Sequence, residues 1–381
     1  MRRTKTIVAV AIAVALAITG AASVALAQPA SRASAKTAAA DDEQRQLQAL
    51  YEKAKAEGGK LTVYVGGDAP GQWDFIAKAF TAQFPDVQVH FVTDLSKYHD
   101  ARIDDQRANH DLVADAAILQ TTQDFDRWKL QGDLLRYKPI GWDDVYGNAK
   151  DADGYWTGAF YGAFSYVVNT NQLPADPSTF RGTDLLQPAY KGKLIFTYPN
   201  DDDAVLFSFK QIIDQYGWKW LRDVMTQDPA FVRGTPNSTA GVANGTYLAA
   251  AGTAGDARPN GALVLPAGER FNTWAQRGAI FKEAPHKAAA KLFMSWLSSK
   301  TAQTNVIASW TWSVRRDVAP PAGLEPLPTY KNTNPDAFAR FMSDRAAVER
   351  FRSQVELYVG RVQGADPADP DNTLGRTPGR F

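Results

Sequence analysis

The chain contains no cysteine among its 381 residues, and this absence excludes several kinds of site. Without thiols there is no disulfide framework, thiolate zinc site, iron–sulfur cluster, cysteine nucleophile or acylated lipoprotein anchor. Histidine is scarce too, with four residues, and their spacing does not match a zinc motif such as H-x₃-H. The sequence therefore predicts no metal site and no cofactor.

An excess of charge of either sign is also missing, because the chain has 42 basic and 41 acidic side chains. No basic field exists to attract nucleic acid, so nucleic acid is not expected as a partner. Hydrophobic residues make up 45% of the chain, which is enough for packed cores. A chain of this length predicts about two domains.

The first residues have the pattern of a signal peptide. Three basic residues within the first five precede an uncharged apolar run over 7–18, and Ala25-Leu-Ala27 forms a small-residue cleavage pattern. We expect cleavage before Gln28 and a periplasmic or secreted protein. Length alone would also allow an uncleaved membrane anchor, but the Gly-, Ser- and Ala-rich second half of the segment favours cleavage.

The first half of the remaining chain alternates strand and helix patterns. Alternating apolar residues predict strands over 60–65, 87–92 and 114–119. Helical spacing follows each of them, over 73–84, over 97–110 and around 125–128. This order is typical of a parallel sheet with crossover helices, which binds ligands at the carboxyl ends of its strands.

The second half begins with a glycine-interrupted β-like run over 155–170, which predicts a strand that crosses between domains. A helix near 180–190, a strand over 193–198, a long helix over 205–216 and short helices within 234–261 should follow. The apolar run 262–266 is interpreted as the return crossing. We expect hinge bending at Gly158, Gly162 and 261–266, and further helices from His286 and over 348–358.

These patterns divide the chain into six predicted regions. They are a signal peptide (1–27), a flexible leader (28–45) from which a charged helix emerges near Asp41, a first lobe (46–160 and 262–318), a second lobe (161–261), a C-terminal helical region (319–359) and a disordered tail (360–381).

Four stretches, 165–174, 190–195, 284–293 and 313–318, resemble one known family in their order and spacing. They are similar to extracellular solute-binding proteins of bacterial ABC importers, in the periplasmic-binding-protein type II class and nearest its ferric-iron-binding branch. The resemblance implies an α/β fold of two lobes, each a mostly parallel sheet flanked by helices, joined by crossing hinge strands. It also implies a monomer that closes on a small solute and delivers it to a membrane permease.

The chain departs from the ferric branch at the iron ligands. That branch holds iron mainly through two adjacent tyrosines, but here Tyr247 stands alone and the segment 248–256 contains no tyrosine. Phenolate oxygens suit a hard trivalent ion, so their loss favours a small organic or oxyanion solute over ferric iron. Ferric iron, or an iron complex, remains the alternative.

Several polar or aromatic segments are predicted to contact the ligand. The loop 66–71 offers backbone N–H groups for an anion, or is a plain turn. In 201–203 one aspartate should cap a helix, while another would face a cation or hydroxyl groups. Segment 235–239 is a polar helix start, and Trp274, like Trp310 and Trp312, is either a stacking platform or core. The predicted ligand contacts are Gly67, Asp68, Gln120, Thr121, Tyr161, Asp201, Asp202, Thr235, Asn237, Ser238 and Trp274.

No catalytic residue is predicted. The sequence has no G-x-S-x-G elbow and no H-E-x-x-H motif. A secreted hydrolase of the two-carboxylate glycosidase type is the alternative from another class, because paired carboxylates leave no sequence signature.

Overall fold

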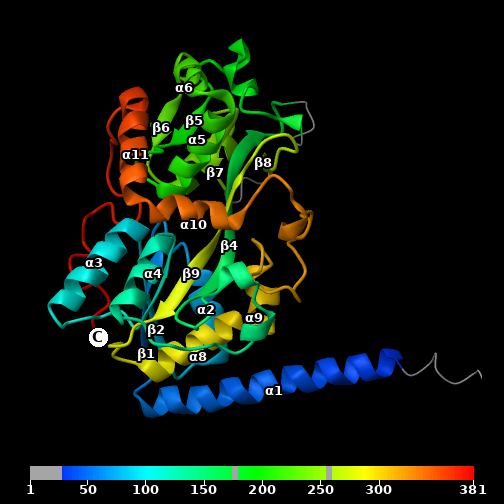
Figure 1. Ribbon diagram of the computed structural model, residues 1–381, viewed down its shortest axis with the longest axis vertical. Coiled ribbons are helices and arrows are strands. Elements are labelled where there is room, and N and C mark those ends of the chain that lie inside the picture. Colours follow the sequence, from blue (N-terminus) through cyan, green and yellow to red (C-terminus); the bar gives the residue numbers. More distant parts are fainter. Residues whose placement is uncertain (1–27, 174–178, 255–259) are drawn as a thin grey trace, which may run out of the picture. The chain divides into compact units, whose positions relative to one another are not determined.

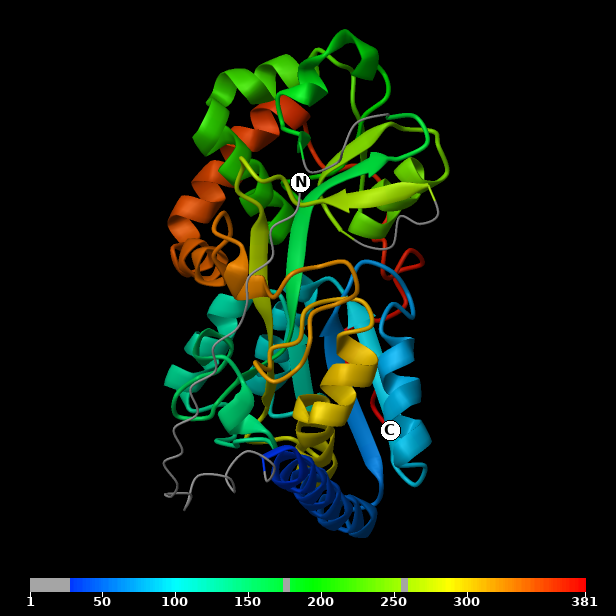
Figure 2. The same ribbon diagram turned by 90° about the vertical axis from the view of Figure 1, so that its right-hand side faces the viewer.

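The computed structural model describes residues 28–173, 179–254 and 260–381, with side chains from residue 41 onward (Figures 1 and 2). It comprises two compact units, residues 1–42 and 43–381. The signal-peptide prediction lies outside the described residues. Within the described part, no helix is both long and apolar enough to cross a membrane.

Helix α1 (Gln28–Ala56) replaces most of the predicted flexible leader. The helix includes residues 28–40, which were expected to be irregular because they lack an apolar stripe. Alanine is the strongest helix former, so the intrinsic propensity of an alanine-rich segment favours a helix even where the sequence has no apolar stripe. The charged helix that was expected from Asp41 is therefore present, but it begins thirteen residues earlier, at Gln28.

Lobe 1 contains the three predicted strand–helix units. Its central strand β1 alternates Leu61, Val63 and Val65 and is buried on both faces, which fits a parallel strand covered by helices. The elements of lobe 1 are β1 (Lys60–Gly66), α2 (Asp74–Gln83), β2 (Gln88–Asp94), α3 (Ser96–Ala108), β3 (Ala116–Leu119), α4 (Thr122–Gln131), α8 (Lys287–Ser298) and α9 (Lys300–Ala302).

Lobe 2 has its own core, formed by strands and helices that follow the first crossing. Helix α11 also belongs to it, because Val348 and Val355 are buried in this core. The elements of lobe 2 are β5 (Ile195–Thr197), α5 (Asp203–Tyr216), α6 (Trp218–Met225), β6 (Ala230–Val232), α7 (Thr235–Ala243), β7 (Ala249–Thr253), β8 (Gly261–Val264) and α11 (Arg345–Val359).

Two long strands connect the lobes. Strand β4 (Thr157–Asn169) pairs with β9 (Asn272–Ile280) through residues 157–164 and with β7 and β8 through 165–169. The main sheet has the order β2-β1-β3-β9-β4-β7, with β8 beside β4 and with β5 and β6 in a separate pair. Figure 1 shows β4 and β9 running between the lobes, with α10 (Pro335–Ser343) beside them.

Two predicted elements of the second half are corrected by the structure. The return crossing is β9, because residues 262–264 of the predicted run belong to β8, which pairs with β4 inside lobe 2. The predicted helix near 180–190 is replaced by two short 3₁₀ turns, Asp184–Leu186 and Pro188–Tyr190. Pro188 lacks the N–H that a continuous helix would need there.

The predicted disordered tail is ordered, and we call residues 360–381 the C-terminal strap. Near its start, the carbonyl of Gly360 accepts a hydrogen bond from Asn200 of lobe 2 at 3.0 Å. Near its end, Tyr64 donates to the carbonyl of Pro378 at 3.0 Å, and Arg376 pairs with Asp111 at 2.6 Å in lobe 1. Both views show it descending from α11 to the region of α3. The strap therefore joins the two lobes.

Candidate functional site

A cavity of about 760 Å³ lies between the lobes, and both lobes line it. Lobe 1 contributes the loops that follow β1, β2 and β3, and lobe 2 contributes the segment before α5 and the start of α7. The carboxyl ends of neighbouring parallel strands meet at one sheet edge, which explains why loops from distant parts of the chain converge here. The volume is that of a small-molecule site.

Most of the predicted contacts line this cavity. Backbone or side-chain atoms of eight of them take part: Gly67, Asp68, Gln120, Thr121, Asp201, Asp202, Thr235 and Trp274. The strand–loop pattern that singled out these residues thus led to one place in the structure.

Three predicted contacts are not among the residues that line the cavity. Tyr161 is buried in β4, where its hydroxyl donates to Asn148 at 2.6 Å. Ser238 is buried within lobe 2 and bonds to the hydroxyl of Thr197 at 2.9 Å. Asn237 is exposed, and its amide donates to the carbonyl of Arg233. Along α7 the cavity-lining positions are Thr235, Pro236, Thr239 and Ala240, so residues 237 and 238 lie on other faces of the helix.

The two lobes touch directly across the cavity. The Oδ2 atom of Asp68 accepts hydrogen bonds from the backbone N–H of Thr235 at 2.9 Å and from its hydroxyl at 2.7 Å. Lys97 forms an ion pair with Asp201 at 2.6 Å. These residues belong to opposite lobes, so the structure shows the lobes closed on each other.

Asp201 is engaged by two cations. Arg233 donates to it at 2.7 Å, in addition to Lys97. Burial opposes ionisation, but the hydrogen bonds from Arg233 and Lys97 outweigh it and lower the pKa of Asp201. Asp201 is therefore an inter-lobe ion-pair partner with little remaining capacity for a ligand.

Asp202 is the predicted helix cap. Its Oδ1 accepts from the backbone N–H groups of Ala204 at 2.7 Å and Val205 at 2.9 Å, at the start of α5. Burial, followed by the negative charge of Asp68, raises the pKa of Asp202. Burial raises the pKa of Asp68 too, against the hydrogen bonds from Thr235. Two carboxylates from opposite lobes thus influence each other at the cavity.

The loop 66–71 does not offer the expected set of free backbone donors. The N–H of Gly67 donates to the carbonyl of Asp94 at 2.9 Å, and that of Asp68 donates to Gln72 at 2.7 Å. The prediction of an anion cradle here is wrong for these two groups. Gly67 has a packing role instead, because an added Cβ would lie 2.8 Å from both Thr93 and Trp73.

An aromatic wall, formed by Trp73, Phe75, Phe160 and Trp310, lines the lobe 1 side of the cavity. Its ring centroids lie close together, at 4.9 Å for Phe160 and Trp310 and 5.6 Å for Trp73 and Trp310. Phe75 and Trp310 are each 41% exposed. Of the four, sequence reasoning considered only Trp310 as a ligand platform. Trp73 was predicted only as the start of the helical spacing over 73–84, although its place directly after the β1 loop also indicates a position at the cavity.

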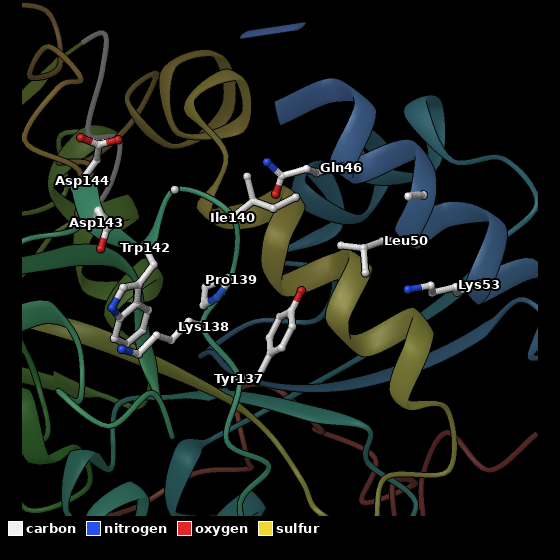
Figure 3. Close-up of a pocket in the computed structure, with 12 residues that line it drawn as sticks. Gln46, Leu50, Lys53, Tyr137, Lys138, Pro139, Ile140, Trp142, Asp143 and Asp144 are labelled. Carbon is white, nitrogen blue, oxygen red and sulfur yellow. The ribbon is translucent and has the colours of Figure 1, made fainter. Parts of the chain in front are cut away.

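The structure also contains a second hollow of about 740 Å³ against the later part of α1 (Figure 3). Gln46, Leu50 and Lys53 line it from α1, and residues 137–144 line it from the facing loop. It shares no lining residue with the cavity between the lobes and includes none of the predicted contacts.

The described residues contain no group of three or more His, Asp or Glu side chains placed to hold a metal ion. The lining of the cavity, within the described part of the chain, includes no tyrosine and no histidine. A ferric ion would therefore lack the phenolate ligands of the ferric branch.

Comparison with known proteins finds one matching family model and several similar structures. Residues 118–230 match the family model of bacterial extracellular solute-binding proteins. No curated protein matches the chain. Among solved structures, iron-bound HitA from Pseudomonas aeruginosa has a TM-score of 0.61 at 18% identity, over 78% of this chain and 99% of that one.

Two further structures are similar over the same extent. The periplasmic binding protein AfuA from Actinobacillus pleuropneumoniae, with fructose-6-phosphate bound, has a TM-score of 0.64 at 18% identity, over 80% of this chain and 100% of that one. The substrate-binding protein of an ABC transporter from Agrobacterium tumefaciens has a TM-score of 0.63 at 15% identity, over 78% and 96%. The predicted resemblance is confirmed: this chain has the two-lobed fold of the periplasmic binding proteins and, over residues 118–230, the sequence features of bacterial extracellular solute-binding proteins.

Proposed function

We propose that the protein is an exported, monomeric solute-binding protein of an ABC importer, which captures a small organic solute between its lobes and passes it unchanged to a membrane permease. The observation that carries this proposal is the cavity between the lobes, with Asp68 of one lobe bonded to Thr235 of the other at its edge. The Asp68–Thr235 hydrogen bonds and the Lys97–Asp201 ion pair hold the lobes together at the cavity, and water can replace these polar contacts when the lobes separate. Opening and closing by hinge motion fits such an interface.

The test is a thermal-shift screen of the mature chain against sugars, phosphates, polyamines, thiamine-like cations and iron complexes. A binding protein should show a concentration-dependent rise in melting temperature with one class of solute. The bound solute should then be recovered chemically unchanged after prolonged incubation and release.

A glycosidase is the second candidate, because Asp68 and Asp202 are two carboxylates with raised pKa values at one cavity. Mass spectrometry of an incubated oligosaccharide mixture distinguishes the two functions. If the wild type forms new reducing ends and the Asp202→Asn variant does not, the protein is a hydrolase and not a binding protein.

Ferric iron is tested separately with ferric citrate. Because no tyrosine is among the described lining residues, we expect neither a phenolate charge-transfer band in the visible spectrum nor a rise in melting temperature. A visible band, or a large stabilisation by iron, would restore the ferric alternative.

A further inference from the structure

The cavity carries two carboxylates that have no cationic partner. Asp68 uses Oδ2 to bind Thr235, and Asp202 uses Oδ1 to cap α5. Within the described residues, Oδ1 of Asp68 and Oδ2 of Asp202 form no hydrogen bond and neither carboxylate forms an ion pair. The nearby cation, Lys97, is held by the side chain and the backbone carbonyl of Asp201, at 2.6 and 2.7 Å. No basic side chain of the described residues is therefore bonded to either carboxyl group.

A third polar group in the same cavity also lacks a partner. Thr121 follows β3, lines the cavity and is only 2% exposed, yet its buried hydroxyl oxygen has no hydrogen-bond partner among the described residues. An unpaired buried hydroxyl costs free energy, and a bound ligand that pairs with it removes that cost. This hydroxyl is thus a second group at the cavity, independent of the carboxylates, that a polar group of a solute could satisfy.

The aromatic wall adds a surface of a kind that attracts cations. Ring faces of tryptophan and phenylalanine bind ammonium groups and stack against flat apolar bodies. The basic side chains that lie over aromatic rings elsewhere in the described structure, such as Arg277 over Trp156 at 3.8 Å, have no counterpart over Trp310 or Phe75. The wall is therefore available to a cation from outside the chain.

We propose that the captured solute is a small organic cation, with its protonated amine or quaternary ammonium group at Asp68 and Asp202 and its apolar body against the aromatic wall. This rests on the proposed function and names its ligand class. An anion would meet two carboxyl groups with no free basic side chain bonded to them, and a neutral solute would supply no charge to pair with them. A cation favours the ionised forms of the two carboxyl groups and pairs with both lobes at once, which stabilises the closed state.

The experiment compares cations with neutral molecules of the same shape. Choline is paired with 3,3-dimethylbutanol, and putrescine with 1,4-butanediol, while spermidine, tetramethylammonium, glucose and inorganic phosphate complete the set. Isothermal titration calorimetry and thermal shift are run on the mature chain at millimolar concentrations. We expect at least one cation to bind and its neutral isostere to bind at least tenfold more weakly.

Two variants test the carboxylates without removing their structural hydrogen bonds. Asparagine is as good a helix cap as aspartate, so Asp202→Asn preserves the start of α5, and Asp68→Asn can still accept from Thr235. Each should weaken cation binding at least tenfold. The control is Asp214→Asn, which removes an exposed carboxylate of α5 that pairs with Lys210, and it should leave affinity unchanged.

The outcomes separate the two proposals. If glucose or phosphate binds to the wild type and to both variants, and no cation binds, the proposal of a cationic ligand is wrong. The proposal of solute capture would still stand. Failure of every cation at millimolar concentration also overturns the cation. Chemical conversion of a solute overturns solute capture itself.

Discussion

At the scale of single residues, His99 shows how burial fixes a protonation state. It is fully buried in α3, where its ring stacks on Tyr64 at 4.7 Å. Arg102 donates to its Nδ1, so the proton sits on Nε2 and is donated to the carbonyl of Val92 at 3.0 Å. Burial, helped by the charge of Arg102, lowers the pKa of His99 to about 3. His99 therefore stays neutral in the folded state.

This gives a pH dependence of stability with a definite sign. The unfolded chain binds a proton at His99 below its ordinary pKa of 6.5, whereas the folded chain does not. The free energy of unfolding should therefore fall as the pH drops from 6.5 toward 3, by about 1.4 kcal/mol per pH unit from this group.

The variant His99→Gln isolates the contribution, because glutamine can donate to Val92 but does not titrate. Urea unfolding at several pH values from neutral to mildly acidic should show the variant as the less stable protein at neutral pH, with a difference that narrows on acidification. Parallel curves for the two proteins would contradict the assignment.

Residue-level prediction led to the cavity where a residue type and a strand end coincide. Asp202 follows a predicted strand and begins a helix, and Gln120 and Thr121 follow another strand, so topology alone brought them to the cavity. On α7 it also included residues that do not line the cavity, because Asn237 and Ser238 are polar like Thr235 but lie on other faces of the helix. A helix start known only to within a few residues does not determine which side of the helix faces a ligand.

At the scale of elements, helices α3 and α4 meet through two acids. Asp100 of α3 and Asp124 of α4 are close enough to share a proton, and burial, then the charge of Asp124, raises the pKa of Asp100 well above its usual range. Asp124 is also bound by Arg127 at 2.8 Å. Asp100 therefore carries the proton in the folded state.

Replacing the protonated carboxyl group of Asp100 by an amide should stabilise the packing of α3 on α4. A raised pKa means that the folded chain holds a proton which the unfolded chain releases above about pH 4, so stability falls as the pH rises. In Asp100→Asn the amide donates to Asp124 at every pH. We expect a higher melting temperature than wild type at pH 8 and little difference at pH 4.

The exposed substitution Asp214→Asn again serves as the control, since its effect should be small and nearly independent of pH. If Asp100→Asn is destabilising at pH 8, the shared proton is not the main interaction between these helices.

Element-level prediction worked for the strand–helix units of lobe 1, because apolar alternation and helical spacing are local properties. It missed β9, whose nine residues are all buried although they include Asn272, Gln276 and Arg277. Arg277 is tolerated there because it pairs with Asp126 at 2.8 Å and lies over Trp156. Asn272 likewise donates to the carbonyl of Ala204 in α5. These two residues depend on partners far away in the sequence, so the strand has no local apolar pattern.

At the scale of the whole molecule, the C-terminal strap was unpredictable from composition for the same reason. Its Gly, Pro, Asp and Arg content is typical of disorder, but a few distant contacts hold it. Arg376 pairs with Asp105 and Asp111, and Arg102 donates to the carbonyl of Gly375 at 2.9 Å. None of the residues after Leu324 lines the cavity in the described structure.

Loss of these contacts should shift the protein toward an open state. In Arg376→Ala the last residues lose their ion pairs with α3 and the adjoining loop, so the strap holds lobe 1 more weakly, through the remaining contacts such as that of Tyr64 with Pro378. Small-angle X-ray scattering of the unliganded variant should give a larger radius of gyration than wild type. Arg350→Ala, which removes an exposed arginine of α11, is the matched control and should leave the radius unchanged.

The anchored chain end has a kinetic consequence. The strap is bonded to both lobes, so wide opening of the cavity requires it to detach from one of them. The rate at which a bound solute is released then depends on a segment that does not line the cavity. The residence time of the solute should therefore depend on Arg376 as well as on the residues that line the cavity.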